Sequence, residues 1–110
     1  MIQTENLPLV TEWDKTFPKS DFVSHEKVTF PNRYGITLAA DLYAPESAEG
    51  KLPAIAVCGP FGAVKEQCSG LYAQTLAERG FVTLAFDPSF TGESGAIPWD
   101  KLESFYRQYL

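Results

Sequence analysis

The sequence is poor in the residues on which most metal and redox sites depend. It has one histidine and two cysteines in 110 residues. The spacing of Cys58 and Cys68 matches no zinc-binding pattern. We therefore expect no metal site and no cofactor. Two cysteines are also too few for a disulfide scaffold, which favours reduced thiols and a cytoplasmic location.

Positive charge is scarce as well. Nine lysines and arginines stand against fourteen acidic residues, which gives a net charge of −5. No cluster of basic residues is available to neutralise phosphates, so nucleic acid is not expected as a partner. The N-terminus lacks the basic and apolar regions of a signal peptide. No apolar run approaches the length of a membrane span, and we expect no membrane association.

What the sequence does contain is the composition of one globular domain, with 45% hydrophobic and 21% charged residues. Residues 1–24 show no hydrophobic period and predict an irregular N-terminal arm. Trp13, Phe17 and Phe22 could pin this arm to the rest of the molecule.

Hydrophobic periodicity predicts a β-hairpin after the arm. From Lys27 onward, Val28 and Phe30 alternate with polar neighbours, and a turn follows over residues 31–35. Residues 36–43 alternate over eight positions, which is typical of a half-buried strand. The short separation of the two runs predicts antiparallel pairing.

Two continuous apolar runs with a helix between them predict a βαβ unit with parallel strands. Residues 52–58 and 81–86 lack alternation, as strands covered on both faces do. Between them, residues 69–79 predict a helix, and Gly80 stands where a C-terminal glycine stop belongs. The predicted apolar stripe of this helix consists of Leu71, Tyr72, Ala73, Leu76 and Ala77.

The two cysteines lie at the ends of these elements. Cys58 closes the first apolar run and is predicted to be a small buried residue. Cys68 lies near the start of the helix and is the better candidate for a reactive thiol, although an inert thiol is the default expectation.

The last residues, 96–110, predict an amphipathic helix with an aromatic face. That face could cover sheet surface, or it could join two copies of the chain. A homo-oligomer would use the aromatic residues Trp99, Phe105, Tyr106 and Tyr109. The predicted fold class is thus α/β: an irregular N-terminal arm (1–24), a hairpin and one βαβ unit (25–95), and a C-terminal helix (96–110).

Three segments occur in a characteristic order. YGITLAADLYAPESAEGKLPAIAVCGPFG joins a strand, a loop, an apolar strand and a Gly-rich turn, and GPFGAVKEQ follows from that turn. AERGFVTLAFDPSFTGES joins a helix end, an apolar strand, an aspartate and Gly-x-Ser. This order resembles the N-terminal portion of the α/β-hydrolase superfamily, in particular its dienelactone-hydrolase-like and X-Pro-peptidase-like members. The resemblance implies a partial α/β-hydrolase fold and serine- or cysteine-type hydrolysis of ester or amide bonds.

The resemblance also implies candidate site residues. A backbone N–H of Phe61, or else of Gly62, would help to stabilise an oxyanion; the alternative is a turn that only ends the strand. Lys65 and Glu66 could pair with Asp87 at the carboxyl end of the next strand, where open sheets place their sites. Alternatively they are surface charges, and Asp87 caps a turn.

The nucleophile and the base of the family mechanism have no counterpart in the expected order. Gly92-Glu93-Ser94-Gly95-Ala96 has only one of the two elbow glycines in place, and no apolar strand leads into it. Cys68 also lacks the leading glycine. His25 comes before the predicted hairpin, whereas the family histidine follows the nucleophile, so an edge or exposed position is expected for it.

We therefore predict a truncated or degenerate α/β-hydrolase that is inactive as an isolated chain. The alternative is a small self-associating interaction module that uses the aromatic C-terminal helix. A third possibility is a small-molecule binding remnant at the Phe61/Asp87 end of the sheet.

Overall fold

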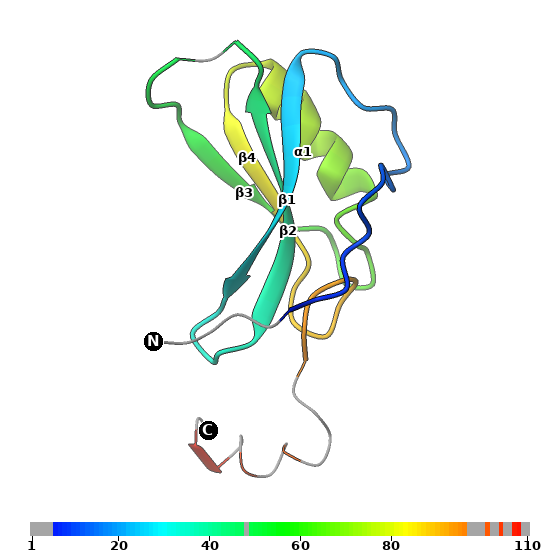
Figure 1. The fold of residues 1–110 in the computed structure, drawn as a ribbon, viewed down its shortest axis with the longest axis vertical. Helices are drawn as coiled ribbons and strands as arrows, with labels where there is room; N and C mark the ends of the chain where they lie inside the picture. Colours follow the sequence, from blue (N-terminus) through cyan, green and yellow to red (C-terminus); the bar gives the residue numbers. More distant parts are fainter. Residues whose placement is uncertain (1–5, 48, 97–100, 102–103, 105–106, 109–110) are drawn as a thin grey trace.

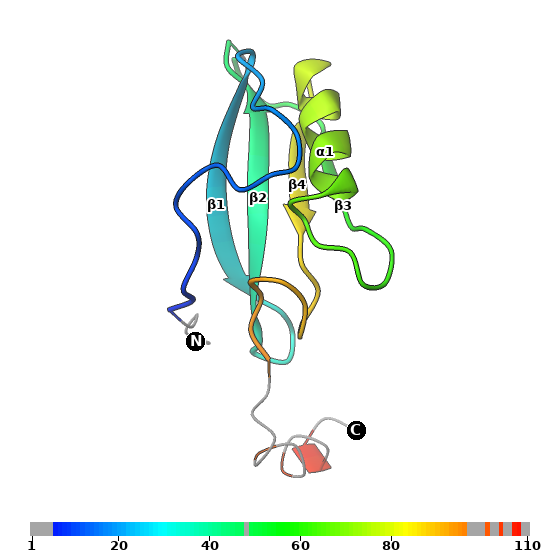
Figure 2. The same cartoon turned by 90° about the vertical axis from the view of Figure 1, so that its right-hand side faces the viewer.

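Four strands form a single sheet, and one helix covers one of its faces (Figures 1 and 2). The computed structural model describes residues 6–47, 49–96, 101, 104 and 107–108. Along the chain the elements are β1 (Val23–Pro31), β2 (Thr37–Pro45), β3 (Ala54–Val57), α1 (Cys68–Glu78) and β4 (Val82–Phe86). Most of the predicted C-terminal helix, including Trp99, Phe105, Tyr106 and Tyr109, lies outside the described residues.

The sheet has the strand order β1-β2-β4-β3 and is mixed. β1 and β2 pair antiparallel, as do β2 and β4, whereas β3 and β4 are parallel. The predicted hairpin and the predicted βαβ unit are both confirmed. β1 begins at Val23 rather than near Lys27, because residues 23–26 already pair with the end of β2.

Asn32 explains the tight connection between β1 and β2. Its side-chain oxygen accepts hydrogen bonds from the backbone N–H groups of Tyr34 and Ile36, at 2.9 and 3.0 Å. Gly35 has a φ of 80°, which a residue without a Cβ adopts readily. The turn residues thus fix the register of the hairpin.

The core lies between α1 and the sheet. Its buried members are Phe17, Val23, Tyr43, Ala73, Ala77 and Ala85, with Trp13 and Val57 packed against them. Phe17 and Trp13 therefore pin the N-terminal arm, as predicted. The expectation for Phe22 was wrong, because its side chain is 73% exposed.

The face that α1 turns toward the sheet differs from the prediction. Leu71 and Tyr72 are exposed, whereas Ala73, Gln74 and Ala77 are buried. Small side chains on the buried face let the helix lie close to the strands, and this close packing leaves no room for the larger residues there. The helix ends as predicted, with Gly80 at a φ of 105° and its N–H bonded to the Ala77 carbonyl at 3.1 Å.

β3 was predicted to be covered on both faces, and this expectation was wrong for the described residues. It is the outermost strand of the sheet, and Ala54 and Ala56 are exposed. Cys58, which directly follows β3, is exposed rather than buried. The reason is that α1 covers only one face of the sheet (Figure 2).

Within the described part of the chain, no helix has both the length and the apolar character needed to cross a bilayer.

The close approach at the start of α1 gives a testable prediction. A Cβ at Gly70 would lie 2.3 Å from the Lys65 carbonyl oxygen and 3.1 Å from the Phe17 ring. We expect Gly70→Ala to lower the free energy of unfolding by about 1–3 kcal/mol, as overpacking does, although alanine favours helices by about 1 kcal/mol over glycine. Urea denaturation measures the change.

Glu78→Ala, at an exposed position of the same helix, is the matched control and should change stability by no more than about 0.5 kcal/mol. A Gly70→Ala variant as stable as the parent would contradict the packing described for this end of the helix.

Candidate functional site

A hollow of about 310 Å³ opens at the carboxyl ends of the two parallel strands, β3 and β4. One wall is the loop of residues 59–63, and the other consists of Pro88, Ser89 and Thr91. Open α/β sheets place their ligands at this end of their strands. The sequence-predicted residues Phe61 and Gly62 both line this hollow.

The loop of residues 59–63 presents backbone donors at the hollow. The N–H of Ala63 bonds to the Pro60 carbonyl at 3.0 Å and closes a turn. Gly62 has a φ of 88°, and the Phe61 ring is fully exposed. Among the described residues, the N–H groups of Phe61 and Gly62 have no hydrogen-bond acceptor. Both groups are therefore available to an oxygen atom of a ligand.

Hydroxyl groups also line the hollow, but no base stands beside them. The Ser89 hydroxyl oxygen accepts a hydrogen bond from the side-chain amide of Asn32 at 3.1 Å. Neither Ser89 nor Thr91 has a histidine or lysine partner among the described residues. These hydroxyls therefore lack the means of activation that a nucleophile needs.

The buried residue Asp87 directly precedes Pro88, one of the residues that line the hollow. Its carboxylate accepts hydrogen bonds from the backbone N–H of Lys65 at 2.8 Å, from Lys65 Nζ at 2.9 Å and from the backbone N–H of Glu93 at 3.1 Å. The side chains of Lys65 and Asp87 are both 0% exposed. Lys65 and Asp87 pair in the interior, so the interpretation as surface charges was wrong for these two residues. The pair joins the two loops that line the hollow.

The same carboxylate leaves no space for a side chain at Gly92. A Cβ at this position would lie 2.3 Å from Asp87 Oδ2, and the residue has a φ of 53°. Two residues earlier, Phe90 adopts a φ of 68°, which is strained for a bulky side chain. The loop from Asp87 to Gly95 is thus shaped tightly around the buried group.

Ser94 belongs to this loop and has a structural role. Its hydroxyl donates to the Asp87 carbonyl at 2.6 Å and accepts from the Ala39 N–H at 2.9 Å. The Gly95 N–H bonds to the Thr37 carbonyl at 2.7 Å. The segment that partly resembles a nucleophile elbow is therefore a loop fastened to β2, not the end of a strand.

Lys65 and Asp87 belong to a continuous set of charged side chains and one histidine, which we call the charge network. Its members are Asp14, Lys15, His25, Lys27, Asp41, Lys65, Glu66, Asp87 and Glu93. Glu93 Oε1 accepts from Lys65 Nζ at 2.8 Å and from Lys27 Nζ at 2.7 Å. Lys65 Nζ also binds Glu66. The ammonium group of Lys65 thereby contacts three carboxylates.

The charge network continues into the N-terminal arm. Asp14 binds Lys27 Nζ at 2.9 Å and Lys15 Nζ at 2.7 Å. Lys15 in turn lies 2.9 Å from Asp41 Oδ1, and the side chains of Lys15 and Asp41 are both 0% exposed. Because positive and negative groups alternate, each charge buried here has a partner of opposite sign.

The charge network shifts the proton affinities of its members. Burial alone would raise the pKa of Asp14, but hydrogen bonds from Lys15 and Lys27 outweigh it and lower the pKa to about 2. The pKa of Glu93 is also lowered, because its hydrogen bonds from lysine outweigh burial. Burial would lower the pKa of Lys65, yet the surrounding carboxylates raise it above its usual range. All three groups are therefore held in their charged forms.

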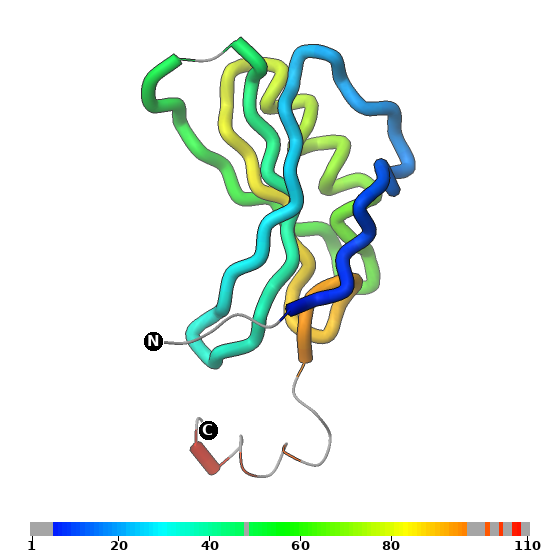
Figure 3. The backbone as a smooth tube through the Cα atoms, viewed as in Figure 1, coloured from blue at the N-terminus to red at the C-terminus, as the bar shows by residue number. Residues whose placement is uncertain are grey.

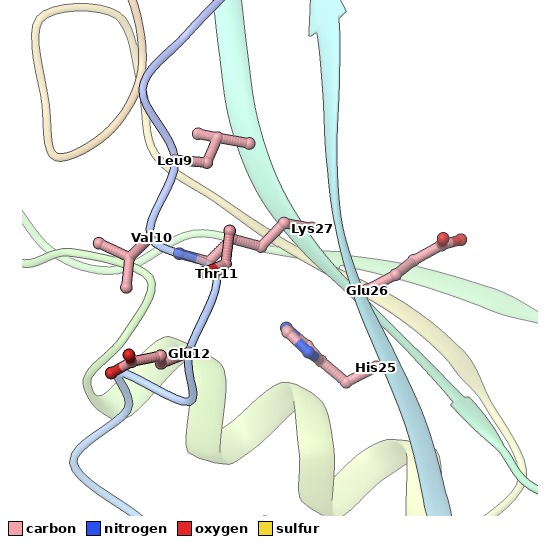
Figure 4. A pocket seen from close by; sticks show the side chains of 7 residues that line it. All are labelled: Leu9, Val10, Thr11, Glu12, His25, Glu26 and Lys27. Carbon is pink, nitrogen blue, oxygen red and sulfur yellow. The ribbon is translucent and has the colours of Figure 1, made fainter.

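His25 lies within the edge strand β1 rather than before the hairpin, and it is half-buried and hydrogen-bonded. Its Nε2 lies 2.6 Å from Asp41 Oδ1, and its ring centre lies 5.2 Å from that of Trp13 and 5.1 Å from that of Tyr43. In Figure 4 the ring extends from β1 toward the arm, into a hollow of about 310 Å³ lined by residues 9–12 and 25–27. No serine or cysteine lines that hollow, so this Asp–His pair has no such nucleophile to activate.

Three carboxylates of the charge network could hold a cation. Ligand oxygens of Asp14, Glu66 and Glu93 lie within 4.8 Å of one another. Lys27 binds the first and third of these residues, and Lys65 binds the second and third. The positive charge at this cluster is thus supplied by the protein's own ammonium groups.

Both cysteines are exposed free thiols. Cys58 and Cys68 line a shallow depression of about 300 Å³ between the end of β3 and the start of α1. The reactivity of Cys68 stays a prediction.

No family model matches the chain. It is 74% identical over 93 residues to the uncharacterized protein PA2218 of Pseudomonas aeruginosa, covering 84% of this chain and 25% of that protein. It is 45% identical over 78 residues to the uncharacterized protein YcjY of Escherichia coli, covering 67% of this chain and 26% of that protein. The chain thus spans about a quarter of the length of these curated relatives.

Solved structures share the arrangement of the sheet. The crystal structure of PA2218 superposes with a TM-score of 0.83 at 72% identity, over 86% of this chain and 30% of that one. Acetyl xylan esterase 1 of Thermoanaerobacterium gives a TM-score of 0.61 at 19% identity, over 76% of this chain and 26% of the esterase. Brefeldin A esterase gives a TM-score of 0.57 at 22% identity, over 73% of this chain and 24% of that esterase. The two esterases have the α/β-hydrolase fold, and the likeness to them is one of fold over part of their chains.

Of the residues that the sequence suggested, Phe61 and Gly62 line the hollow, whereas Lys65, Glu66 and Asp87 do not line it and belong to the charge network. The other members of the charge network were not predicted. His25 and Lys27 lie on one face of β1, and Asp41 lies directly opposite Lys27 on β2. The alternation of polar residues along these strands was the available signal. Periodicity alone does not distinguish a buried charged face from a solvated one.

The lowered pKa of Asp14 gives a prediction for acid stability. A carboxylate whose pKa is lowered by folding contributes stability above its unfolded value of 3.8, and this is lost as the pH falls toward about 2. We expect the free energy of unfolding to decline through this window and Asp14→Asn to make the decline shallower. Urea denaturation at a series of pH values tests this.

Glu78→Gln, at an exposed position of α1, is the control and should leave the pH dependence as it is in the parent. An Asp14→Asn variant with an unaltered acid profile would refute the role given to this carboxylate.

Proposed function

We propose that this chain forms one edge of an α/β-hydrolase catalytic sheet that cleaves ester or amide bonds by acyl transfer. In this proposal the chain supplies the backbone donors for the oxyanion, the N–H groups of Phe61 and Gly62. The nucleophile, the acid and the histidine come from outside the described residues, because His25 is bound to Asp41 and Ser94 is bound to β2.

The observation that carries the proposal is that the hollow is lined by residues whose backbone N–H groups have no hydrogen-bond acceptor. The hollow lies at the carboxyl ends of β3 and β4, and Phe61 and Gly62 line it. An oxyanion needs N–H groups that are held in place and have no acceptor of their own. The fold likeness to two esterases supports the same conclusion.

Anion binding tests the donor role directly. Inorganic phosphate is a small tetrahedral anion, and we expect millimolar phosphate to shift the amide resonances of Phe61 and Gly62 in a ¹⁵N NMR titration. Gly50 is the matched control, since it is also an exposed glycine with a positive φ but lies in the loop before β3. Equal shifts at Gly50 and Gly62, or none at either, would argue against a donor site at residues 61 and 62.

The absence of a nucleophile is tested by hydrolysis of p-nitrophenyl acetate. We expect no turnover from the 110-residue chain above that of heat-denatured protein. Turnover that disappears in Ser94→Ala or in Cys68→Ala would overturn the assignment of the nucleophile to residues outside this chain.

The acyl-transfer part of the proposal is tested on purified PA2218 with p-nitrophenyl esters of short and medium acyl chains, where we expect hydrolysis. Inactivity across the series would count against this part of the proposal.

A further inference from the structure

The loop of residues 58–64 is anchored strongly at its two ends and weakly within. At its start, Val57 pairs with Ala85 in the sheet. Within it, the bonds are local ones, from the Ala63 N–H to the Pro60 carbonyl and from the Val64 N–H to the Gln67 side chain at 3.2 Å. The position of the Phe61 and Gly62 donors therefore depends on the residue that anchors the C-terminal end of this loop.

Lys65 is that anchor, and it holds the loop by both its backbone and its side chain. Its N–H and its Nζ bind the two different oxygens of the Asp87 carboxylate. A buried ion pair generally contributes less stability than well-packed apolar side chains of the same volume. The pair does fix the relative orientation of the two loops, because two hydrogen bonds to one carboxylate are compatible with only one arrangement of them.

The N-terminal arm contacts two residues that bind Lys65, namely Glu66 and Glu93. The Thr16 N–H donates to the Glu66 carbonyl at 3.0 Å, directly after Lys65. Glu93 accepts from Lys65 Nζ through one oxygen and from the Val10 N–H, at 2.7 Å, through the other. Figure 3 shows residues 10–16 passing beside the segment before α1 and the segment after β4.

Lys27 completes the connection between the arm and the loop. Its ammonium group bridges Asp14 on the arm and Glu93 on the loop after β4. Residues far apart in the sequence are thus linked in one line, from Asp14 through Lys27 and Glu93 to Lys65.

We propose that Lys65 is a positioning residue for the loop of residues 58–64, and that the N-terminal arm sets the position of Lys65 through Lys27 and Glu93. The importance of that loop rests on the function proposed above. The placement of the loop by Lys65 and the arm is a property of the chain itself and is measurable without catalysis.

Amide hydrogen exchange of the full 110-residue chain tests this proposal. The Ala63 N–H is bonded within the loop, and the Val64 N–H is bonded to the Gln67 side chain just beyond Lys65, so their exchange reports the opening of the loop and of its C-terminal end. In Lys65→Met we expect these two amides to exchange about tenfold faster or more relative to the Ala77 amide, since a charge-assisted hydrogen bond is lost. Lys51→Met, at an exposed lysine, is the matched control and should change neither amide.

A second control separates positioning from a general loss of stability. Val23 is a buried core residue remote from Lys65 in the sequence, and Val23→Ala should accelerate Ala63, Val64 and Ala77 together. If Lys65→Met does the same, or leaves the loop unchanged, Lys65 is not a positioning residue. Should that variant fail to fold, Glu93→Gln, which keeps the Lys65–Asp87 pair, is measured in the same way with the same criterion.

The role of the arm is tested by Lys27→Met, which leaves every contact of Lys65 in place. Faster exchange of Ala63 and Val64 relative to Ala77 is expected, and an unchanged ratio overturns this part of the proposal. Phosphate titration of the unsubstituted chain reports on the function proposed above. A failure of phosphate binding with a positive exchange result would thus remove the donor function and leave the positioning intact.

Discussion

The buried carboxylate of Asp87 is the group on which the arrangement of this end of the molecule depends. It follows β4, and it binds the backbone of the loop before α1 and of the loop after β4. Such a group is stable in the interior only when all its oxygens are satisfied and its charge is balanced. Lys65 supplies the balancing charge, and Gly92 supplies the space.

The remaining charges are linked to this carboxylate through successive ion pairs. Lys65 needs further acceptors for its three protons, and Glu66 and Glu93 provide them. Glu93 then needs Lys27, which needs Asp14 on the arm. The polar face of β1 and β2 is therefore turned inward, and the arm is held by ion pairs as well as by the packing of its aromatic side chains.

The sequence predicted those features that local rules govern. The hairpin follows from alternation and from the turn at Asn32, and the βαβ unit follows from two apolar runs and Gly80. The buried stripe of α1 was predicted only in part, because Ala73 and Ala77 are buried as expected whereas the larger Leu71 and Tyr72 are exposed. The exposure of β3 depends on what covers it, and the path from Asp14 to Lys65 joins residues that are 13, 66 and 28 positions apart in successive steps. Neither feature therefore has a local signal.

The position of His25 limits which chemistry this chain can contribute. The base in an acyl-transfer mechanism must reach the hydroxyl or thiol that attacks. His25 faces Asp41 and the arm, and it does not line the hollow that holds Phe61 and Gly62. Donor geometry and proton transfer are thus separated in the proposed function, which gives the N–H groups of Phe61 and Gly62 to the oxyanion and leaves activation of the nucleophile to residues outside the described ones. In that proposal the charge network positions the loop, because the hydrogen bonds within the loop are few and its C-terminal end is held by the Lys65–Asp87 pair.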